Sequence, residues 1–316
     1  MSFKQKIICI IGPTASGKTR LSIDLAKWLN TEIISADSVQ VYKELDIGSA
    51  KPTIQEMQGI THHMISVIDV NNDAFSVAEY SRIACDKINE VLNKGMIPII
   101  VGGSGLYISS IIKPLNFAVP SDKDIRLRLE KEYDDDPNKF LKQLSAVDEI
   151  SAKRLHLKDK KRLVRAMEVY AISGNPISSY GDGFEEESKK NSIYSPIQIG
   201  IQMSRELLYK RIDDRVDAMI SNGLLNEART LYEKKYSRSL PGIQSLGYSQ
   251  LFDYFDGTYT LEQAIENIKK QTRHFAKRQM TWFRRENDIY WIEFDGTDYE
   301  SLLNSAKKHL EEQIHE

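Results

Sequence analysis

The sequence predicts an α/β protein with a doubly wound parallel sheet of the P-loop NTPase-like type and an inserted all-helical domain. Short apolar runs alternate with amphipathic helical segments over residues 1–120 and again over residues 191–316, as in the βαβ units of such sheets. Residues 121–190 lack any strand pattern. One strand-to-helix junction also fits G-x-x-x-x-G-K-S/T, a Gly-rich motif that holds phosphates.

The strands of the sheet can be followed along the chain. Ile7–Ile11 is an apolar run that suits a buried strand, and an amphipathic helix follows as far as about Leu29. The run "EIISAD" predicts a second strand that ends near Asp37, and "HMISVID" predicts a third. A helix that begins with a capping box at Ser76 leads to "MIPIIVGG", a fourth strand whose unbroken apolar run is typical of parallel sheets.

The chain changes character after the fourth strand. From Ser121 to about Ile172 it is helical and highly charged, and the soft stretch "SGNPISSYGDGFEEESKKNS" follows before a fifth strand, "SPIQIGIQMS". We expect residues 121–190 to be a helical domain inserted between the fourth and fifth strands and joined by flexible connections. Such a domain can close over a P-loop as a lid. A fixed helical layer is the alternative.

The Gly-rich motif predicts a phosphate site. Its glycines let the backbone amides turn inward at the start of a helix, where anions are favoured. Lys18 would reach the terminal phosphates, and the Thr19 hydroxyl would bind Mg²⁺. The predicted phosphate-binding residues are Gly12, Pro13, Thr14, Ala15, Ser16, Gly17, Lys18 and Thr19. The motif indicates bound phosphates without identifying a kinase.

Polar side chains gather where the second strand ends, in "SADSVQVYKELDIGSAKP". Asp37, Ser38 and Gln40 fall within four residues. A glutamine amide can pair with the N6/N7 edge of adenine, and an aspartate can accept a proton from an exocyclic amine. A polar turn that caps the strand is the alternative. Asp37 and Asp69 are both candidates for a Mg²⁺-binding aspartate at a strand end.

Two basic helices suggest a polyanionic substrate. Lys269–Arg285 has seven Lys or Arg and no acidic residue, and helical spacing places Lys270, Arg273, Lys277 and Arg284 on one side. A second basic helix reads "AKRLHLKDKKRLVRAMEV". A solvated face is the alternative, but such faces usually mix signs, so phosphate contact is favoured.

Composition excludes several classes of protein. The chain has 316 residues, 28% of them charged, and a formal net charge of −2, so any nucleic-acid surface must be local. Cys9 and Cys85 are the two cysteines and cannot form a disulfide framework. No apolar stretch reaches membrane-spanning length. We expect a cytoplasmic protein without membrane contact.

Five blocks together resemble the bacterial tRNA dimethylallyltransferases. They are "GPTASGKT", "ISADSVQVYKELDIGSAKP", "PIIVGGSGLY", "DKKRLVRAMEVY" and "TRHFAKRQMTWFRR", in that family's order and across nearly the whole chain. The resemblance implies transfer of a dimethylallyl group from its diphosphate to N6 of the adenosine immediately 3′ of the anticodon in tRNA. It also implies a channel that the two substrates enter from opposite ends. A monomer is expected.

The resemblance implies roles for single residues. The acceptor, an exocyclic amine, needs a proton acceptor in place, and we choose Asp37 as the general base. Ser104 and Arg215, by the resemblance, contact the diphosphate and complete the catalytic group with Lys18, and Mg²⁺ is the expected cofactor. The implied tRNA-binding residues are Asp37, Ser38, Val39, Gln40, Ser104, Arg126, Lys161, Arg162, Leu163, Val164, Arg165, Gln244, Gly247, Tyr248, Lys270, Arg273, Lys277, Arg278, Gln279 and Arg284.

This chain departs from the family pattern at two positions. Ser104 stands where the family usually has Thr, which keeps the hydroxyl and removes the methyl group that fixes its rotamer. Ser249 stands where Arg or Lys is common, so one tRNA contact is in doubt. His62 and His63 also match the family, and no third ligand at suitable spacing supports a metal site there.

Two other functions compete with prenyl transfer. The phosphate-binding motif taken alone favours a P-loop kinase acting on a small molecule or a nucleotide, which would also bind ATP. An RNA-binding NTPase without transfer chemistry is the third class.

Overall fold

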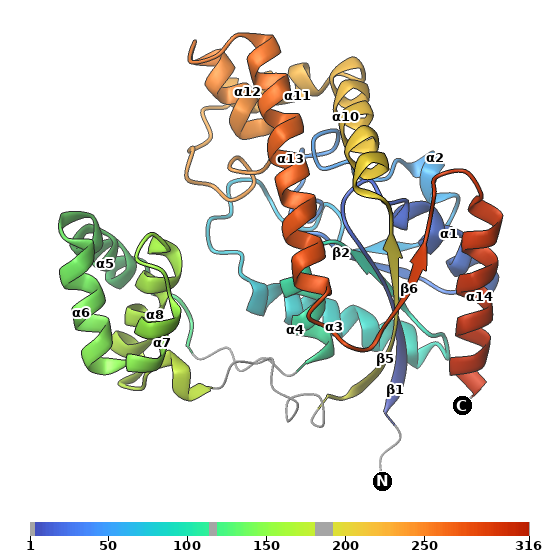
Figure 1. The fold of residues 1–316 in the computed structure, drawn as a ribbon, viewed down its shortest axis with the longest axis horizontal. Helices are drawn as coiled ribbons and strands as arrows, with labels where there is room; N and C mark the ends of the chain where they lie inside the picture. The colour runs from blue at the N-terminus through green and yellow to red at the C-terminus, as the bar shows by residue number, and fades with distance from the viewer. Residues whose placement is uncertain (1–3, 114–118, 181–191, 316) are drawn as a thin grey trace. The chain divides into compact units, whose positions relative to one another are not determined.

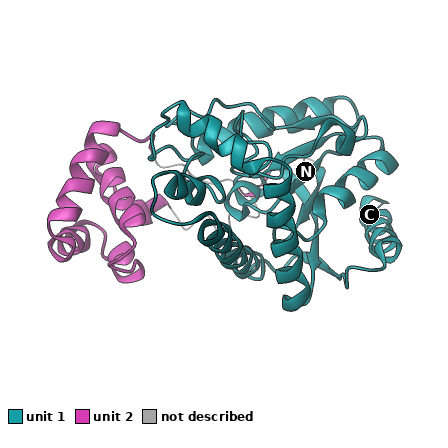
Figure 2. Ribbon diagram, turned by 90° about the horizontal axis from the view of Figure 1, so that it is seen from above, with its two compact units in different colours: residues 1–112, 193–316 teal, residues 113–192 magenta. Residues whose placement is uncertain are grey.

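The computed structural model describes residues 4–113, 119–180 and 192–315. The chain divides into two compact units, one of residues 1–112 with 193–316 and one of residues 113–192 (Figure 2). The second unit lies within the sequence of the first, as an insertion does. None of the helices formed by the described residues is long and apolar enough to cross a membrane.

A parallel sheet of six strands forms the centre of the first unit (Figure 1). The strands are β1 (Gln5–Ile11), β2 (Ile33–Ala36), β3 (His62–His63), β4 (Ile99–Gly102), β5 (Tyr194–Gln202) and β6 (Ile289–Glu293), in the order β3-β2-β4-β1-β5-β6. Ile11 pairs with Gly102, which in turn pairs with Ala36. The carboxyl ends of β1, β2 and β4 therefore meet, and ligands bind at such an edge.

Helices cover both faces of the sheet. They are α1 (Lys18–Leu29), α2 (Ile54–Met57), α3 (Val77–Asn93), α4 (Gly105–Ile112), α10 (Arg205–Ser221), α11 (Leu224–Glu233), α12 (Tyr248–Phe255), α13 (Leu261–Phe283) and α14 (Tyr299–His315). Ile7 and Cys9 of β1 face a core shared with α3, α4 and α11–α13, while Ile8 and Ile10 face α1 and α14. Both faces are buried, which explains why the strand is apolar throughout.

The second unit is helical in its described part. It contains α5 (Lys123–Asp135), α6 (Pro137–Val147), α7 (Glu149–Arg154), α8 (Lys160–Ser173) and the 3₁₀ turn η1 (Ile177–Tyr180). Its own core includes Leu129, Phe140, Leu144 and Leu163. An aspartate caps the start of each α-helix through backbone amides: Asp122, Asp136, Asp148 and Asp159. Such caps satisfy amides that have no partner in the helix. Most of the soft stretch after Ser173 lies outside the described residues.

Two strand expectations differ from the structure. The run "HMISVID" contributes only its first residue to a strand, β3 (His62–His63), because Met64 and Ser66 take φ values of 62° and 52°, which end the extended conformation. Ile68 of the same run makes an isolated bridge to Tyr42. The sixth strand, "IYWIE", is an edge strand that the sequence reading missed. Its exposed Tyr290 beside buried Ile289 shows the alternation that could have revealed it.

Candidate active site

The Gly-rich motif forms a loop between β1 and α1. Its backbone turns through positive φ at Gly12 (147°), Ala15 (63°) and Gly17 (96°), and Gly17 caps α1. A Cβ atom on Gly12 would lie 3.0 Å from the Ile201 carbonyl oxygen of β5, so a side chain at this position would crowd that backbone atom. The sharp turn directs the helix N-terminus at a hollow, which is the geometry of an anion site.

Two cations face this hollow. Lys18 Nζ donates a hydrogen bond to the Pro13 carbonyl, and Arg215 of α10 reaches Thr14 Oγ1 at 3.4 Å. Burial, together with the charge of Arg215, lowers the pKa of Lys18 to about 7, while Asp37 opposes the shift. Burial also lowers the pKa of Arg215. Two desolvated cations side by side are a costly arrangement that a bound polyanion would relieve.

The lowered pKa predicts how anion binding depends on pH. A bound diphosphate favours the Lys18 ammonium, so the pKa in the complex lies above that in the free protein. Binding therefore takes up a proton above pH 7, and affinity should fall by up to about tenfold per pH unit between about pH 7 and 9. Calorimetric titration of inorganic diphosphate measures this. The control is Lys18→Arg, which does not titrate in that range. The same slope in both proteins would contradict the expectation.

Asp37 is fixed by the turn that follows β2. Its Oδ1 accepts hydrogen bonds from the backbone amides of Val39 (2.8 Å) and Gln40 (3.2 Å). The carboxylate also lines a small cavity together with Lys18 and Thr19. The turn thus holds one oxygen and orients the group, as the capping alternative proposed, and it does so beside the phosphate loop. Capping and a role in catalysis are compatible here.

Gln40 has a different place from the one expected. Its Oε1 accepts from Ser35 Oγ at 3.0 Å, and its Nε2 donates to the carbonyls of Ser49 (3.4 Å) and Ala50 (3.2 Å). Both ends of the amide are therefore used to hold the loop after Asp37 against the end of β2. Pairing of this side chain with an adenine edge stays a prediction, and it would require these internal bonds to be exchanged.

Ser104 joins the Gly-rich loop after β4, residues 102–105, to the Asp37 turn. Its Oγ accepts from the Ser38 amide at 3.1 Å and lies 3.3 Å from the Ser38 hydroxyl, and its own amide donates to the Ala36 carbonyl. The hydroxyl that survives the Thr-to-Ser departure is thus held by the turn after β2. Asp69, the other candidate for a metal-binding aspartate, is exposed and forms an ion pair with Lys43 instead.

Three cavities meet at these side chains. A small one of about 70 Å³ is lined by Thr14, Lys18, Asp37 and Arg215 among others. One of about 790 Å³ opens on the outer side of the phosphate loop and shares Lys18, Thr19 and Arg215 with it. One of about 440 Å³ lies beyond Asp37, shares Thr14, Asp37 and Arg215, and has apolar walls that include Phe275. This arrangement fits the expected channel with two entrances.

Thr19 suits a Mg²⁺ ion that is coordinated mainly by substrate phosphate oxygens and water. It is exposed and lines two of the three cavities. The described residues contain no group of three or more His, Cys, Asp or Glu that could hold a metal ion. Mg²⁺ commonly keeps several waters and takes one or two protein ligands plus phosphate oxygens, so Thr19 with a diphosphate would fit it. His62 and His63 are engaged with the Ile60 carbonyl and Glu32.

Helix α13 carries the basic segment, and its faces differ from those expected at one position. Lys270, Lys277 and Arg284 are exposed, while Arg273 donates to both carboxylate oxygens of Asp213 on α10, at 2.5 and 2.7 Å. The acidic partner lies on another element, so a reading of this segment alone could not reveal it. Arg278 is exposed and lines the 440 Å³ cavity.

The salt dependence of RNA binding tests this helix. Each phosphate contact adds about one unit or less to the slope of log affinity against log salt, so replacing Lys270, Lys277 or Arg284 with Ala should reduce its magnitude by that amount. Arg273→Ala should change it less, because Asp213 already balances that charge. Binding to tRNA across a salt series measures the slopes. Arg82→Ala on α3 is the control, since that arginine is exposed and pairs with Asp86. Unchanged slopes in all three variants would mean that these side chains form a solvated face and do not contact RNA phosphates.

The basic residues of the helical unit are tied to a buried carboxylate. Glu168 of α8 is fully buried and accepts from Arg126 (2.6 Å), Arg165 (2.7 Å), Ser121 Oγ (2.7 Å) and the Asp122 amide (3.1 Å). Burial alone would raise the pKa of Glu168, but the hydrogen bonds from Ser121 and both arginines outweigh it and lower that pKa. The ion pairs orient both arginines while leaving Arg126 partly exposed.

The remaining residues of this block divide by exposure. Lys161 and Arg162 are exposed, which suits phosphate contact. Leu163 and Val164 are 0% and 2% exposed and pack in the core of the helical unit. The helical period turns their side chains inward, so a contact of these two residues with tRNA, which stays a prediction, would have to involve their backbone.

The segment before α12 also combines exposed and buried residues. Gln244 is exposed and lines the 440 Å³ cavity with Gly247. Tyr248 is fully buried and donates to Glu227 of α11 at 2.6 Å, so its ring packs inside the protein, and its expected tRNA contact stays a prediction. Ser249 donates to the Ser245 carbonyl at 3.3 Å. Its neutral side chain supplies no positive charge for a contact with RNA phosphate.

Sequence reasoning missed two residues that shape the site. Glu227 accepts from the amides of Asp46, Ile47 and Gly48 and so anchors the far end of the Asp37 loop. No pattern around Glu227 marks it. Arg211 of α10 donates to the Ala15 carbonyl of the phosphate loop at 2.9 Å. It lies four residues before Arg215, on the same side of the helix, a spacing that could have been noticed.

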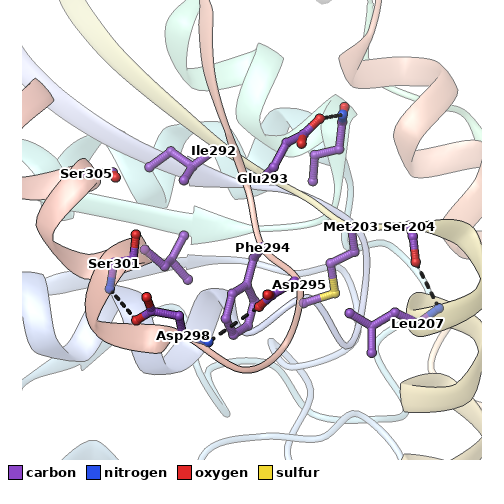
Figure 3. A pocket seen from close by; sticks show the side chains of 12 residues that line it. Met203, Ser204, Leu207, Ile292, Glu293, Phe294, Asp295, Asp298, Ser301 and Ser305 are labelled. Atoms are coloured by element: carbon purple, nitrogen blue, oxygen red, sulfur yellow. Dashed lines mark hydrogen bonds between the residues drawn. The ribbon is translucent and has the colours of Figure 1, made fainter.

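A separate hollow of about 600 Å³ lies where β5 and β6 end (Figure 3). Its acidic side chains serve the local backbone: Asp298 accepts from the Ser301 amide at 2.9 Å and Asp295 from the Thr297 amide at 2.9 Å. Glu293 accepts from Gln202. These contacts account for the acidic groups as caps and cross-strand partners, so the hollow is not assigned to the site.

Comparison with known proteins bears out the resemblance. The family model described as IPP transferase matches residues 40–286. A tRNA dimethylallyltransferase of Acetivibrio thermocellus is 44% identical over 308 residues, 96% of this chain and 97% of that protein. The tRNA dimethylallyltransferase of Bacillus subtilis is 42% identical and covers 92% of this chain and 91% of its own length.

Solved structures agree with these relatives. The crystal structure of a full-length tRNA isopentenylpyrophosphate transferase from Bacillus halodurans has a TM-score of 0.72 and 37% identity and covers 99% of both chains. A eukaryotic dimethylallyltransferase described as acting on tRNA has a TM-score of 0.81 and 27% identity, and it covers 96% of this chain and 77% of its own. The predicted fold class is confirmed. The chain belongs to the IPP transferase family.

Proposed function

We propose that this protein transfers the dimethylallyl group of dimethylallyl diphosphate to N6 of the adenosine immediately 3′ of the anticodon in tRNA and releases diphosphate. One observation carries the proposal most directly. Asp37 lines both the small cavity of about 70 Å³, which Lys18 and Thr19 also line, and the apolar cavity of about 440 Å³. A base at that junction can meet an acceptor amine while cations hold a leaving group.

The phosphate loop acts on the leaving group. As the carbon–oxygen bond of the allylic diphosphate stretches, negative charge grows on the diphosphate. The amides of the loop, Lys18 and Arg215 face the place where this charge develops, so they stabilise the transition state without reorganising. Mg²⁺ bound to the diphosphate with Thr19 would supply further positive charge. The outer cavity of about 790 Å³ would admit dimethylallyl diphosphate.

The acceptor side removes a proton. The adenosine N6 lone pair forms the new bond to the allylic carbon as the bond to the diphosphate oxygen breaks, and one N6 proton passes to Asp37. The adenine base of the tRNA must leave its stack to reach the cavity of about 440 Å³, at a cost of a few kcal/mol. The hydrogen bonds to Asp37 Oδ1 fix the carboxylate for this transfer.

The basic elements bind the RNA backbone. Lys270, Lys277 and Arg284 around α13 and Lys161 and Arg162 of α8 are exposed and would contact phosphates without reading sequence. We assign the helical unit of residues 113–192 to tRNA binding, with Arg126 and Arg165 held by Glu168. Because we propose a tRNA substrate, we also propose that the enzyme acts in the cytoplasm.

One incubation separates this function from the other two classes. The protein is mixed with dimethylallyl diphosphate labelled in its carbon chain, γ-labelled ATP and unmodified tRNA. We expect the carbon label to move to the RNA and the γ-phosphate to stay on ATP. Transfer of the γ-phosphate to an acceptor would indicate a kinase, and RNA-stimulated release of phosphate would indicate an NTPase.

A further inference from the structure

One buried side chain of α13 connects the two loops that form the phosphate site. Gln279 is 6% exposed. Its Oε1 accepts from the Thr14 amide at 2.8 Å, and its Nε2 donates to the Gly103 carbonyl at 2.9 Å. Both ends of one amide are thus used, one on each loop. A buried amide with two well-made bonds allows little movement of either partner.

Each partner of Gln279 adjoins a group that acts in the proposed reaction. Thr14 lies within the phosphate loop and contacts Arg215. Gly103 precedes Ser104, which bonds the Ser38 amide in the Asp37 turn. A Cβ atom on Gly103 would lie 2.1 Å from the Gln279 Nε2, so a side chain there would displace the Gln279 amide. Gln279 therefore stands between the phosphate loop and the turn that carries the general base.

The same helical turn faces the acceptor cavity. Phe275 and Arg278 line the cavity of about 440 Å³, and Phe275 and Gln279 line the small cavity beside Lys18. Lys277 next to them is exposed. Because an α-helix moves as a rigid body over one turn, a shift of α13 when RNA phosphates bind its basic side moves the Gln279 amide as well.

We propose that Gln279 is a positioning residue that couples tRNA binding on α13 to the geometry of the diphosphate-binding site around the phosphate loop, Lys18 and Arg215. This rests on the proposed function and replaces the expected direct contact of Gln279 with tRNA, for which its buried, doubly bonded side chain is unsuited. Bound RNA holds α13 in one position, and the Gln279 side-chain amide then fixes the Thr14 and Gly103 peptides. With these peptides fixed, the site binds the diphosphate more tightly. The coupling is reciprocal, so diphosphate tightens RNA binding by the same factor.

Binding measurements with and without RNA test the coupling. Calorimetry gives the affinity of inorganic diphosphate with Mg²⁺, first for the protein alone and then for its complex with an anticodon stem-loop RNA. In the unaltered protein we expect RNA to increase the affinity for diphosphate by roughly 5- to 150-fold. In Gln279→Leu this factor should fall below about twofold, while the RNA affinity measured without diphosphate stays within about threefold.

Gln271→Leu is the matched control, since Gln271 is an exposed glutamine of the same helix; its coupling should be unchanged. Gln279→Glu keeps an acceptor for the Thr14 amide and loses the donor to Gly103, so it too should lose coupling, and it serves if the leucine variant does not fold. Full coupling in a folded variant, or no coupling in the unaltered protein, would overturn the proposal. Failure of the unaltered protein to bind diphosphate would instead refute the proposed function.

Discussion

Replacing Asp37 with asparagine is expected to reduce turnover by about 10²–10⁴-fold, or roughly 3–5 kcal/mol of barrier. Asparagine keeps the size of the side chain and an oxygen that can accept from the Val39 and Gln40 amides. It cannot accept a proton at neutral pH. The turn should therefore stay intact, and tRNA and dimethylallyl diphosphate should still bind within a few-fold of normal.

Single-turnover rates across a Mg²⁺ titration, with both binding constants measured separately, decide the role of Asp37. A rate defect that persists at all Mg²⁺ concentrations supports the general base. Rescue by higher Mg²⁺ would make Asp37 a metal ligand, and near-normal turnover would leave the reaction without its base. Asp69→Asn is the matched control, since that aspartate is exposed and paired with Lys43; its rate should not change.

Replacing Lys18 with alanine should lower turnover by roughly 10²-fold or more, because it removes a positive charge from the place where the diphosphate becomes more negative. The affinity for tRNA alone should barely change, since Lys18 lies in the cavities around the phosphate loop. Binding of inorganic diphosphate should weaken as well, because one of the two cations that face the hollow, Lys18 and Arg215, is lost.

The matched control is Lys43→Ala, an exposed lysine whose partner is Asp69. Steady-state rates at saturating concentrations of both substrates, together with tRNA binding measured without diphosphate, give the comparison. If Lys18→Ala lost tRNA affinity and kept full turnover, the diphosphate would have to bind elsewhere in the protein.

The sequence predicted well wherever a local pattern fixes the structure. The apolar run of β1 is buried on both faces, and the glycines of the phosphate loop take backbone angles that favour glycine. Capping residues placed the start of α3, where Ser76 accepts from the Glu79 amide. These features depend on neighbours within a few residues, so periodicity and residue type suffice to predict them.

The residues whose contacts the sequence could not predict have partners far away in the sequence. Gln279 bonds Thr14 across 265 positions, and Arg273 pairs with Asp213 across 60. A motif shows that such a residue belongs to the site, but it does not show whether the side chain faces substrate or protein. Leu163 and Val164 stand in a basic block, which predicts a place near tRNA, but their apolar side chains are buried in the core of the helical unit.

The central claim is that the phosphate loop holds a leaving group and that a carbon–oxygen bond breaks. Dimethylallyl diphosphate with ¹⁸O in the oxygen that bridges carbon and phosphorus tests it directly. After reaction with unmodified tRNA, mass spectrometry locates the heavy oxygen, and digestion of the RNA locates the new group. We predict that all ¹⁸O leaves in the diphosphate and that the RNA gains one dimethylallyl group on N6 of the adenosine 3′ of the anticodon. Heavy oxygen in the RNA, or phosphate transferred to it, would contradict the account.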